Sequence, residues 1–307
     1  MKNNLSFLLA ILSGLLLTSC GDSENPKDLD PPVISSLTAG QEIQPSPGML
    51  VTPSNQSVNV DFRVSDPSGV KEILLDIHGG FDGHSHARLT NSFERLNVKR
   101  IFSSTASNPN LVIPSGAQDV SIDSHEIAWE GTNSEVVGNL LAGPYHITIS
   151  ATDSEGNQTG FADGSNYHTT FYIQRPYAPA ISLAKKPNGK LEASVGQNLI
   201  LAGQVKVTDH SLSSPLKFIW MRLTNEVSLD EQKDIAESTF AEVMLGTSSW
   251  RSLSGDPLES AHTLDLAAFI AQHPLQVPAG QQNLSLVIWA EDTAGNVTRE
   301  SIPLEIK

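Results

Sequence analysis

The feature that most limits the fold of this chain is a degenerate repeat of one strand-and-turn pattern. The first copy opens with "PPVISSLTAG" at Pro31, and the second opens with "APAISLAKKPNGK" at Ala178. In the first copy, "SVNVDFRV" alternates apolar and polar residues with a period of two, which is the pattern of a half-buried β-strand. Both copies close on a strand followed by Asp-x-x-Gly-Asn, at Asp153 and Asp292, and this spacing is typical of a tight hairpin turn.

Short strands with regularly spaced turns predict an all-β chain of two tandem immunoglobulin-like β-sandwich domains. The length of 307 residues suits two domains, which we expect at 32–175 and 176–307. The pattern is similar to the immunoglobulin-like or cadherin-like modules of bacterial surface proteins. Three segments are predicted to be short helical insertions, namely "NSFERLNVKRIF", "SLDEQKDIAESTFAEVML" and "AHTLDLAAFIAQH".

The N-terminus reads "MKNNLSFLLAILSGLLLTSC" and is predicted to be a lipoprotein signal peptide over residues 1–19. Its apolar run from Leu5 to Leu17 is too short to span a bilayer. The tetrapeptide that ends in Cys20 resembles the lipobox of bacterial lipoproteins, which implies that Cys20 carries the lipid and becomes the mature N-terminus. Residues 20–31 are acidic and contain proline, so we expect a flexible tether. An acidic stretch at this place also resembles the signal for export to the outer surface. The expected location is therefore the outer membrane, lipid-anchored and exposed at the cell surface.

The charge and cysteine content exclude several kinds of partner. The net charge of -15 argues against nucleic acid, because phosphate binding needs a basic surface. Cys20 is the only cysteine, so neither an intramolecular disulfide nor a thiolate zinc site can form. Any metal site must therefore use histidine and carboxylate ligands.

Three of the nine histidines lie in the stretch "DIHGGFDGHSHARL", from Asp76 to Leu89. We expect "VKEILLDIH" to be a strand, with Ile73, Leu75 and Ile77 in the core and with Asp76 and His78 on the outer face. If "GGFDG" is a five-residue loop, antiparallel pairing sets two outward pairs opposite each other, namely His78 with His84 and Asp76 with His86. Opposite side chains of this kind lie close enough to bind one ion, since their Cβ atoms are ~4.5–5.5 Å apart.

A later strand is predicted to add to this cluster. In "PYHITISATD", His146 shares the outer surface with His78 if Tyr145 and Ile147 face the core. His125 could approach from the preceding segment. The matching strands of the second copy contain no histidine, so the fold does not require these residues. The predicted metal ligands are His78, His84 and His86, with Asp76 or His146 completing the set. A hairpin turn explains Asp153 and Asp292 without calcium.

The segments "SDPSGVKEILLDIHGGFDGHSHARL" and "AGPYHITISATDSEGN" together resemble an uncharacterised domain family of bacterial lipoproteins. Its members have a His-rich segment after the third strand and a Tyr-His pair before the Asp-x-x-Gly-Asn turn. The resemblance implies the domain type and supports the choice of His78, His84, His86 and His146. It implies no reaction.

Two functions follow from these observations. The first is a lipid-anchored cell-envelope protein whose first domain binds a transition metal, either Zn, Cu, Ni or Fe, to capture it or to hand it to an outer-membrane transporter. The alternative is a non-catalytic surface module that binds an extracellular glycan or protein without a metal. Exposed aromatic residues would favour the alternative, and the residues concerned are Trp129, Trp220, Trp250 and Trp289; of these, Trp220 and Trp289 are expected to be buried in the core. We expect no enzymatic activity, because no nucleophile motif is present and only Glu94 and Glu126 offer a general base.

Overall fold

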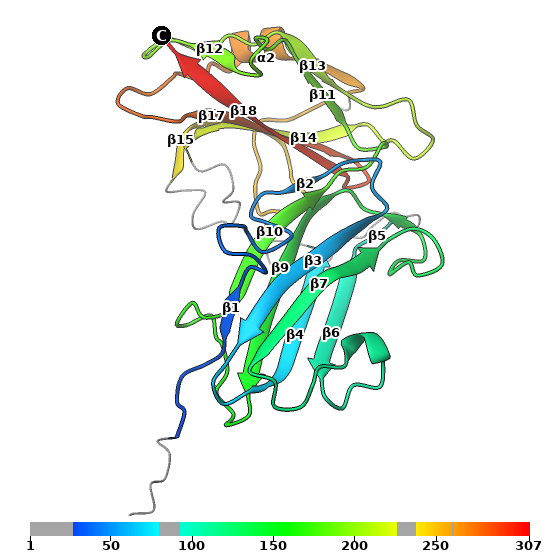
Figure 1. The fold of residues 1–307 in the computed structure, drawn as a ribbon. Helices are drawn as coiled ribbons and strands as arrows, with labels where there is room; N and C mark the ends of the chain where they lie inside the picture. The colour runs from blue at the N-terminus through cyan, green and yellow to red at the C-terminus, as the bar shows by residue number, and fades with distance from the viewer. Residues whose placement is uncertain (1–26, 80–92, 226–237, 260) are drawn as a thin grey trace, which may run out of the picture.

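The computed structural model describes residues 27–79, 93–225, 238–259 and 261–307, and it is nearly all β (Figure 1). Its strands form two tandem immunoglobulin-like β-sandwiches, which confirms the predicted fold class. One sandwich lies below the other in Figure 1, and the strands of the upper one run across those of the lower one. The segment that contains Cys20 lies outside the described residues. Among the described residues, no helix is both long and apolar enough to cross a membrane.

The first sandwich packs a three-stranded sheet against a five-stranded one. The smaller sheet has the order β1 (Val33–Ser35), β3 (Ser57–Ser65), β7 (Asp119–Ala128). The larger has the order β2 (Leu50–Val51), β10 (Tyr167–Ile173), β9 (Gly143–Asp153), β4 (Val70–Gly79), β6 (Asn97–Ser103). A small parallel pair, β5 (Phe93–Glu94) with β8 (Asn139–Leu140), and the 3-10 turn η1 (Pro109–Leu111) complete this half.

The second sandwich repeats the same plan. Its smaller sheet has the order β11 (Ala180–Leu183), β13 (Gly203–Lys206), β16 (Thr263–Asp265). The larger has the order β12 (Leu191–Ala193), β18 (Val297–Ile306), β17 (Ser285–Asp292), β14 (Leu216–Thr224), β15 (Thr239–Gly246). The two five-stranded sheets therefore correspond strand by strand, with β4 and β14 as equivalents and β9 and β17 as equivalents.

Period-two alternation produces the core of the first sandwich, as predicted. Along β3, the residues Val58, Val60, Phe62 and Val64 are buried while their neighbours are partly or fully exposed. Along β4, the inward residues are Ile73, Leu75 and Ile77, and all three are fully buried. The outward residues of β4 therefore include Asp76 and His78, because successive side chains of a strand point to opposite faces.

One of the three predicted helical insertions is a helix. The helix α2 (Leu266–Gln272) begins after Asp265, whose side chain accepts a hydrogen bond from the Ala268 N–H, and it buries Phe269 and Ile270. The prediction of a helix in "NSFERLNVKRIF" is wrong for the described residues 93–102, which form β5 and β6. Pairing with β4 outweighs any local helical tendency there, since Val98 and Phe102 face the core with strand periodicity. In "SLDEQKDIAESTFAEVML", Ser238 is helical and the strand β15 (Thr239–Gly246) follows it, while residues 228–237 lie outside the described residues.

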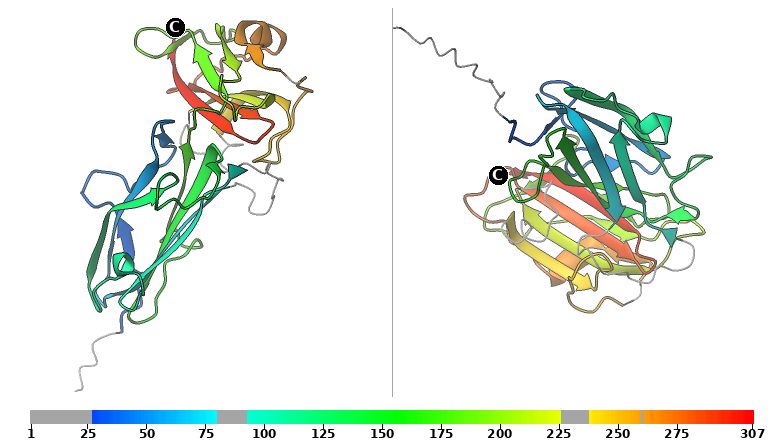
Figure 2. Two further views of the ribbon diagram at one scale, coloured as in Figure 1. Left: turned by 90° about the vertical axis from the view of Figure 1, so that its right-hand side faces the viewer. Right: turned by 90° about the horizontal axis from the view of Figure 1, so that it is seen from below.

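A third apolar cluster lies where the two sandwiches meet. From the first sandwich and the connecting segment it contains Phe93, Leu141, Tyr172 and Tyr177, and from the second it contains chiefly Phe218, Trp220, Trp250 and Trp289. The expectation for two of these residues needs correction. Trp220 and Trp289 are buried, but they face the first sandwich and do not belong to the core of their own sandwich. Two views at right angles show the sandwiches in contact end to face (Figure 2).

Candidate functional site

Strand pairing brings the predicted residues His78 and His146 side by side. The strands β4 and β9 are antiparallel, with His78 opposite His146 and Asp76 opposite Thr148. The ring centres of the two histidines are 5.7 Å apart. This confirms that His146 lies on the same outer face as His78, because Tyr145 and Ile147 are fully buried in the core. His146 itself is only 8% exposed.

Asp76 contacts His78 directly. Oδ1 of Asp76 is 2.7 Å from Nδ1 of His78, and the two side chains are 34% and 45% exposed. An ionised carboxylate can only accept, so Nδ1 of His78 is the donor of this hydrogen bond. In a neutral imidazole with this tautomer, the lone pair is on Nε2.

The structure adds a third histidine that the sequence analysis did not identify. His168 lies on β10, opposite Thr148 of β9, and its ring centre is 5.2 Å from that of His146. The ring of Phe161 lies edge-on to His168 at 5.5 Å, and Phe161 is 69% exposed. A signal was present in the sequence, because the Tyr-His pair of β9 is repeated in β10 as "YH" at Tyr167.

The predicted pairing of His84 and His86 is wrong. Both edges of β4 are occupied by other strands, and on the edge assigned to those histidines the partners of His78 and Asp76 are Asn97 and Lys99 of β6. The strand that returns beside β4 therefore begins farther along the chain than a five-residue loop allows. His84 and His86 themselves lie outside the described residues.

The other residues considered from the sequence do not lie on this face. His125 and Glu126 belong to β7, which is in the opposite sheet. The ring of His125 packs against the core residue Phe102 at 5.2 Å, and burial lowers the pKa of His125, with the charge of Arg100 adding to the effect. The carboxylate of Glu94 accepts a hydrogen bond from the Val137 N–H.

The second sandwich carries none of this chemistry at the equivalent positions. The two larger sheets can be aligned from the equivalent turn residues Asp153 and Asp292, by counting back along β9 and β17 and following the strand register. The four positions Asp76, His78, His146 and His168 then correspond to Arg222, Thr224, Ser285 and Ser301. Arg222 is fully buried, and burial together with Arg299 and Arg251 lowers the pKa of Arg222 to about 9.

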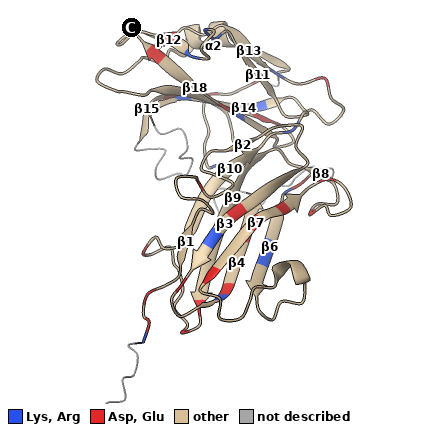
Figure 3. Ribbon diagram, viewed as in Figure 1, with Lys and Arg blue, Asp and Glu red and all other residues tan. Residues whose placement is uncertain are grey.

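A group of three carboxylates lies beside the first described residues of the chain. Acidic residues gather at this end of the first sandwich (Figure 3). Oxygens of Asp28, Asp66 and Asp153 all lie within 4.8 Å of one another, which within the described ranges holds for no other group of three potential metal ligands. Asp66 accepts hydrogen bonds from Ser68, and Asp153 accepts them from Asn157. These bonds confirm that Asp153 belongs to a hairpin turn.

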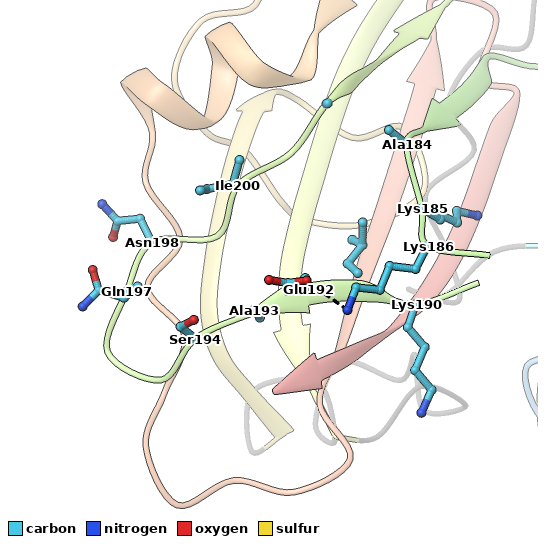
Figure 4. A pocket seen from close by; sticks show the side chains of 12 residues that line it. Ala184, Lys185, Lys186, Lys190, Glu192, Ala193, Ser194, Gln197, Asn198 and Ile200 are labelled. Carbon is cyan, nitrogen blue, oxygen red and sulfur yellow. Dashed lines mark ion pairs between the residues drawn. The ribbon is translucent and has the colours of Figure 1, made fainter. Parts of the chain in front are cut away.

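The four tryptophans do not form an exposed surface of the kind that binds glycans. Trp129, Trp220, Trp250 and Trp289 are each at most 3% exposed. A hollow of about 750 Å³ lies on the second sandwich (Figure 4) and has no aromatic residue in its lining. Of its lysines, Lys186 is paired with Glu192 and Glu305, and Lys185 is paired with Glu300. This hollow belongs to the other sandwich and does not adjoin the histidines.

Comparison with known proteins shows a domain but no activity. A family model described as Domain of unknown function (DUF4625) matches residues 18–164, which include β4 and β9. A search of curated proteins finds no match. The first copy therefore contains a domain for which no function is recorded in the family description.

Solved structures that resemble the chain include immunoglobulin-like modules and a surface glycan-binding protein. They include latent PorU from Porphyromonas gingivalis, with 15% identity, a TM-score of 0.26 and coverage of 93% of this chain and 21% of PorU. SGBP-B of Bacteroides ovatus, in complex with a mixed-linkage heptasaccharide, has 13% identity, a TM-score of 0.23 and coverage of 90% and 48%. The Ig1-2 module of Drosophila DLAR has 12% identity, a TM-score of 0.24 and coverage of 91% and 100%. The chain thus spans about half or less of the first two proteins, and at these scores the likeness indicates neither ligand nor partner.

Proposed function

We propose that this is a lipid-anchored protein of the cell envelope whose first sandwich binds a transition metal ion on the outer face of β4, β9 and β10. The lipid is carried by Cys20, which places the protein at the outer membrane. The ion is captured there or handed to an outer-membrane transporter. The protein has no catalytic role in this proposal.

The observation that supports the proposal is the grouping of imidazoles on adjacent strands. His78, His146 and His168 lie on three neighbouring strands with ring centres 5.7 and 5.2 Å apart along the row. Asp76 adds a carboxylate to the same face. The equivalent face of the second sandwich has no histidine, so a requirement of the fold does not account for the group.

The donor atoms limit the metals that suit this face. Imidazole suits Zn, Cu, Fe and Ni, whereas Ca²⁺ and Mg²⁺ prefer sets of oxygen ligands. Without a thiolate, the face has no means of favouring Cu(I). Among divalent ions of one ligand set, Cu²⁺ generally binds most tightly, so we expect affinity in the order Cu²⁺ above Zn²⁺.

Titration calorimetry on the purified mature protein in detergent tests the proposal. We expect Zn²⁺ and Cu²⁺ to bind with a stoichiometry of one, and we expect His78→Ala to weaken binding about tenfold or more. His262→Ala is the matched control, because it removes one exposed histidine of the second sandwich and should leave the affinity unchanged. Absence of binding by the wild type at micromolar metal, or equal binding by His78→Ala, overturns the proposal.

The alternative is a surface module that binds a glycan or a protein without a metal. Exposed tryptophans would favour this alternative, but all four tryptophans are buried. Among the described residues, the exposed aromatic side chain beside the histidines is Phe161, and a single ring offers little area for stacking on a sugar. The grouped histidines therefore support the metal-binding proposal more directly.

A further inference from the structure

We infer that the ion of the proposed site is held above Thr148 by three imidazoles, those of His78, His146 and His168, and that Asp76 orients His78 and is not itself a ligand. This inference rests on the proposed function and specifies its ligand set. It differs from the sequence-based set in adding His168 and in changing the role of Asp76.

The register places Thr148 at the centre of the group. Asp76 lies opposite Thr148 on one neighbouring strand, and His168 lies opposite it on the other. Such directly opposite residues have Cβ atoms about 5 Å apart, and the diagonal neighbour, here His78, lies at about 7–8 Å. His146 is the next outward residue along β9 itself, at about 7 Å. Asp76, His78 and the two other histidines thus surround the shorter side chain of Thr148. The four longer side chains can meet in the space above Thr148.

The spacing of the rings suits a shared ion. Two imidazoles bound to one tetrahedral metal at ~2.0–2.1 Å have ring centres about 5 Å apart. The observed separations are 5.7 Å between His78 and His146 and 5.2 Å between His146 and His168. The nitrogens of all three do not lie within 4.8 Å of one another. Binding therefore requires the partly exposed His78 and His168 to turn toward Thr148 by rotation about χ1 and χ2.

Asp76 has the position of an orienting carboxylate. Histidines that bind a metal through one nitrogen commonly donate the other N–H to a carboxylate, which fixes the tautomer and the ring orientation. The contact of 2.7 Å between Asp76 Oδ1 and His78 Nδ1 is of this kind, and it leaves Nε2 as the ligand atom. On the other edge of β4, Lys99 of β6 lies opposite Asp76. The Asp76 carboxylate therefore has a lysine on one side and the histidines of β9 and β10 on the other.

Substitution of Thr148 tests the position of the ion without removing a ligand. Thr148→Leu fills the space above residue 148 and should weaken Zn²⁺ binding about tenfold or more. Thr148→Val keeps the shape of threonine and removes only the hydroxyl, so it is the matched control and should bind within about threefold of the wild type. Equal affinities of all three proteins overturn the inference, as does an equal loss in both variants. Thermal unfolding confirms that each variant is folded.

X-ray absorption of the zinc-loaded protein tests the assigned roles. We expect three imidazole ligands in the wild type and in Asp76→Asn, and two in His168→Ala. Asp76→Asn should lower the affinity about 10–100-fold while the ligand count stays at three, because only the orientation of His78 is lost. In the protein without metal, nitrogen-15 NMR should find the proton of His78 on Nδ1 in the wild type and redistributed in Asp76→Asn. A carboxylate ligand in the wild type, or three imidazoles in His168→Ala, overturns the inference.

The two proposals fail in different ways. If the wild type binds no Zn²⁺ or Cu²⁺, the proposed function fails and the ligand assignment fails with it. If the wild type binds and His78→Ala does not, the proposed function stands. Under that result, unchanged binding by Thr148→Leu and His168→Ala overturns only the assignment made here.

Discussion

Replacing Trp250 by alanine should separate the unfolding of the two sandwiches. The indole belongs to the second sandwich, is 3% exposed and donates a hydrogen bond to the Gly295 carbonyl at 2.6 Å. Its ring packs against three residues of the first sandwich. The ring centre of Tyr145 is 6.2 Å away, and a Cβ built on Gly143 would lie 2.7 Å from the indole. Arg95, also from the first sandwich, lies over the ring at 4.6 Å.

The expected magnitude follows from the size of the buried ring. Truncation of a buried phenylalanine or tryptophan to alanine costs about 3–5 kcal/mol. A domain is stable by only about 5–15 kcal/mol. A loss of this size at the interface therefore removes a large share of the free energy with which each sandwich stabilises the other. With the cluster intact, each sandwich would expose Trp220, Trp289 or Tyr172 if its partner unfolded alone. We therefore expect the wild type to unfold as one unit.

Differential scanning calorimetry on the purified protein measures this directly. The wild type should give one transition whose calorimetric and van't Hoff enthalpies agree, and Trp250→Ala should give two. Trp129→Ala is the control, because Trp129 is 2% exposed and belongs to the core cluster of the first sandwich and not to the interface cluster. Trp129→Ala should lower the stability of the protein by a similar amount. The two sandwiches should remain coupled for as long as the first sandwich is folded. Two independent transitions in the wild type, or a single shifted transition in Trp250→Ala, would refute the reasoning.

Three further predictions concern the anchor, a buried carboxyl and the histidines. Cys20→Ala should release the protein from the membrane fraction, and unchanged sedimentation with membranes would count against lipidation. Burial raises the pKa of Asp292 to about 6 from 3.8, so its contribution to stability is present below pH 3.8 and is lost as the pH rises through about 6. Relative to Asp292→Asn, urea titrations should therefore show the wild type losing about 2 kcal/mol from pH 4 to pH 7. Zn²⁺ affinity should fall as the pH drops from about 7 to 5, because protons compete for imidazole, and a pH-independent Kd would contradict histidine ligation.

The sequence predicted the parts of the site that depend on strand periodicity. Alternation alone assigned Ile77 to the core and His78 to the outer face, and the same rule placed His146 outward between Tyr145 and Ile147. The adjacency of their strands followed from the order of strands in an immunoglobulin-like sheet. Both inferences use properties that any residue of a strand has, so they needed no knowledge of a particular contact.

The pairing of the His-rich segment could not be predicted in this way. A glycine-rich stretch indicates a loop but does not fix its length, and a change of length replaces every cross-strand partner. The partner strand β6 begins at Asn97, so Asn97 and Lys99 stand where His84 and His86 were expected. His168 could not be predicted in this way, because it lies far along the chain from the other histidines and joins the group only through the pairing of β9 with β10.

The burial of the tryptophans could be predicted from the sequence, but the surface that they pack against could not. All eight residues of β17 are buried, and a strand that is apolar on both faces is covered on both. The sandwich core covers one face, and the first sandwich covers the other, through Tyr172 and Leu141. Continuous apolar runs therefore predicted burial correctly, but they could not say that the second covering layer is the neighbouring sandwich.

The two equivalent sheets consequently use the same outer face for different purposes. In the second sandwich, the face of β14 and β17 carries Trp220, Trp289 and Arg222, and it is closed by the contact between the halves. In the first, Tyr172 on the corresponding face takes part in the same contact. The imidazoles lie farther along these strands, with the His78 side chain 45% exposed and His146 8% exposed. A closed face favours apolar side chains, whereas a partly exposed face can carry polar side chains that reach a ligand. The divergence of these four positions between two copies of one architecture is therefore what we expect if the first copy has a ligand and the second serves to hold the pair together.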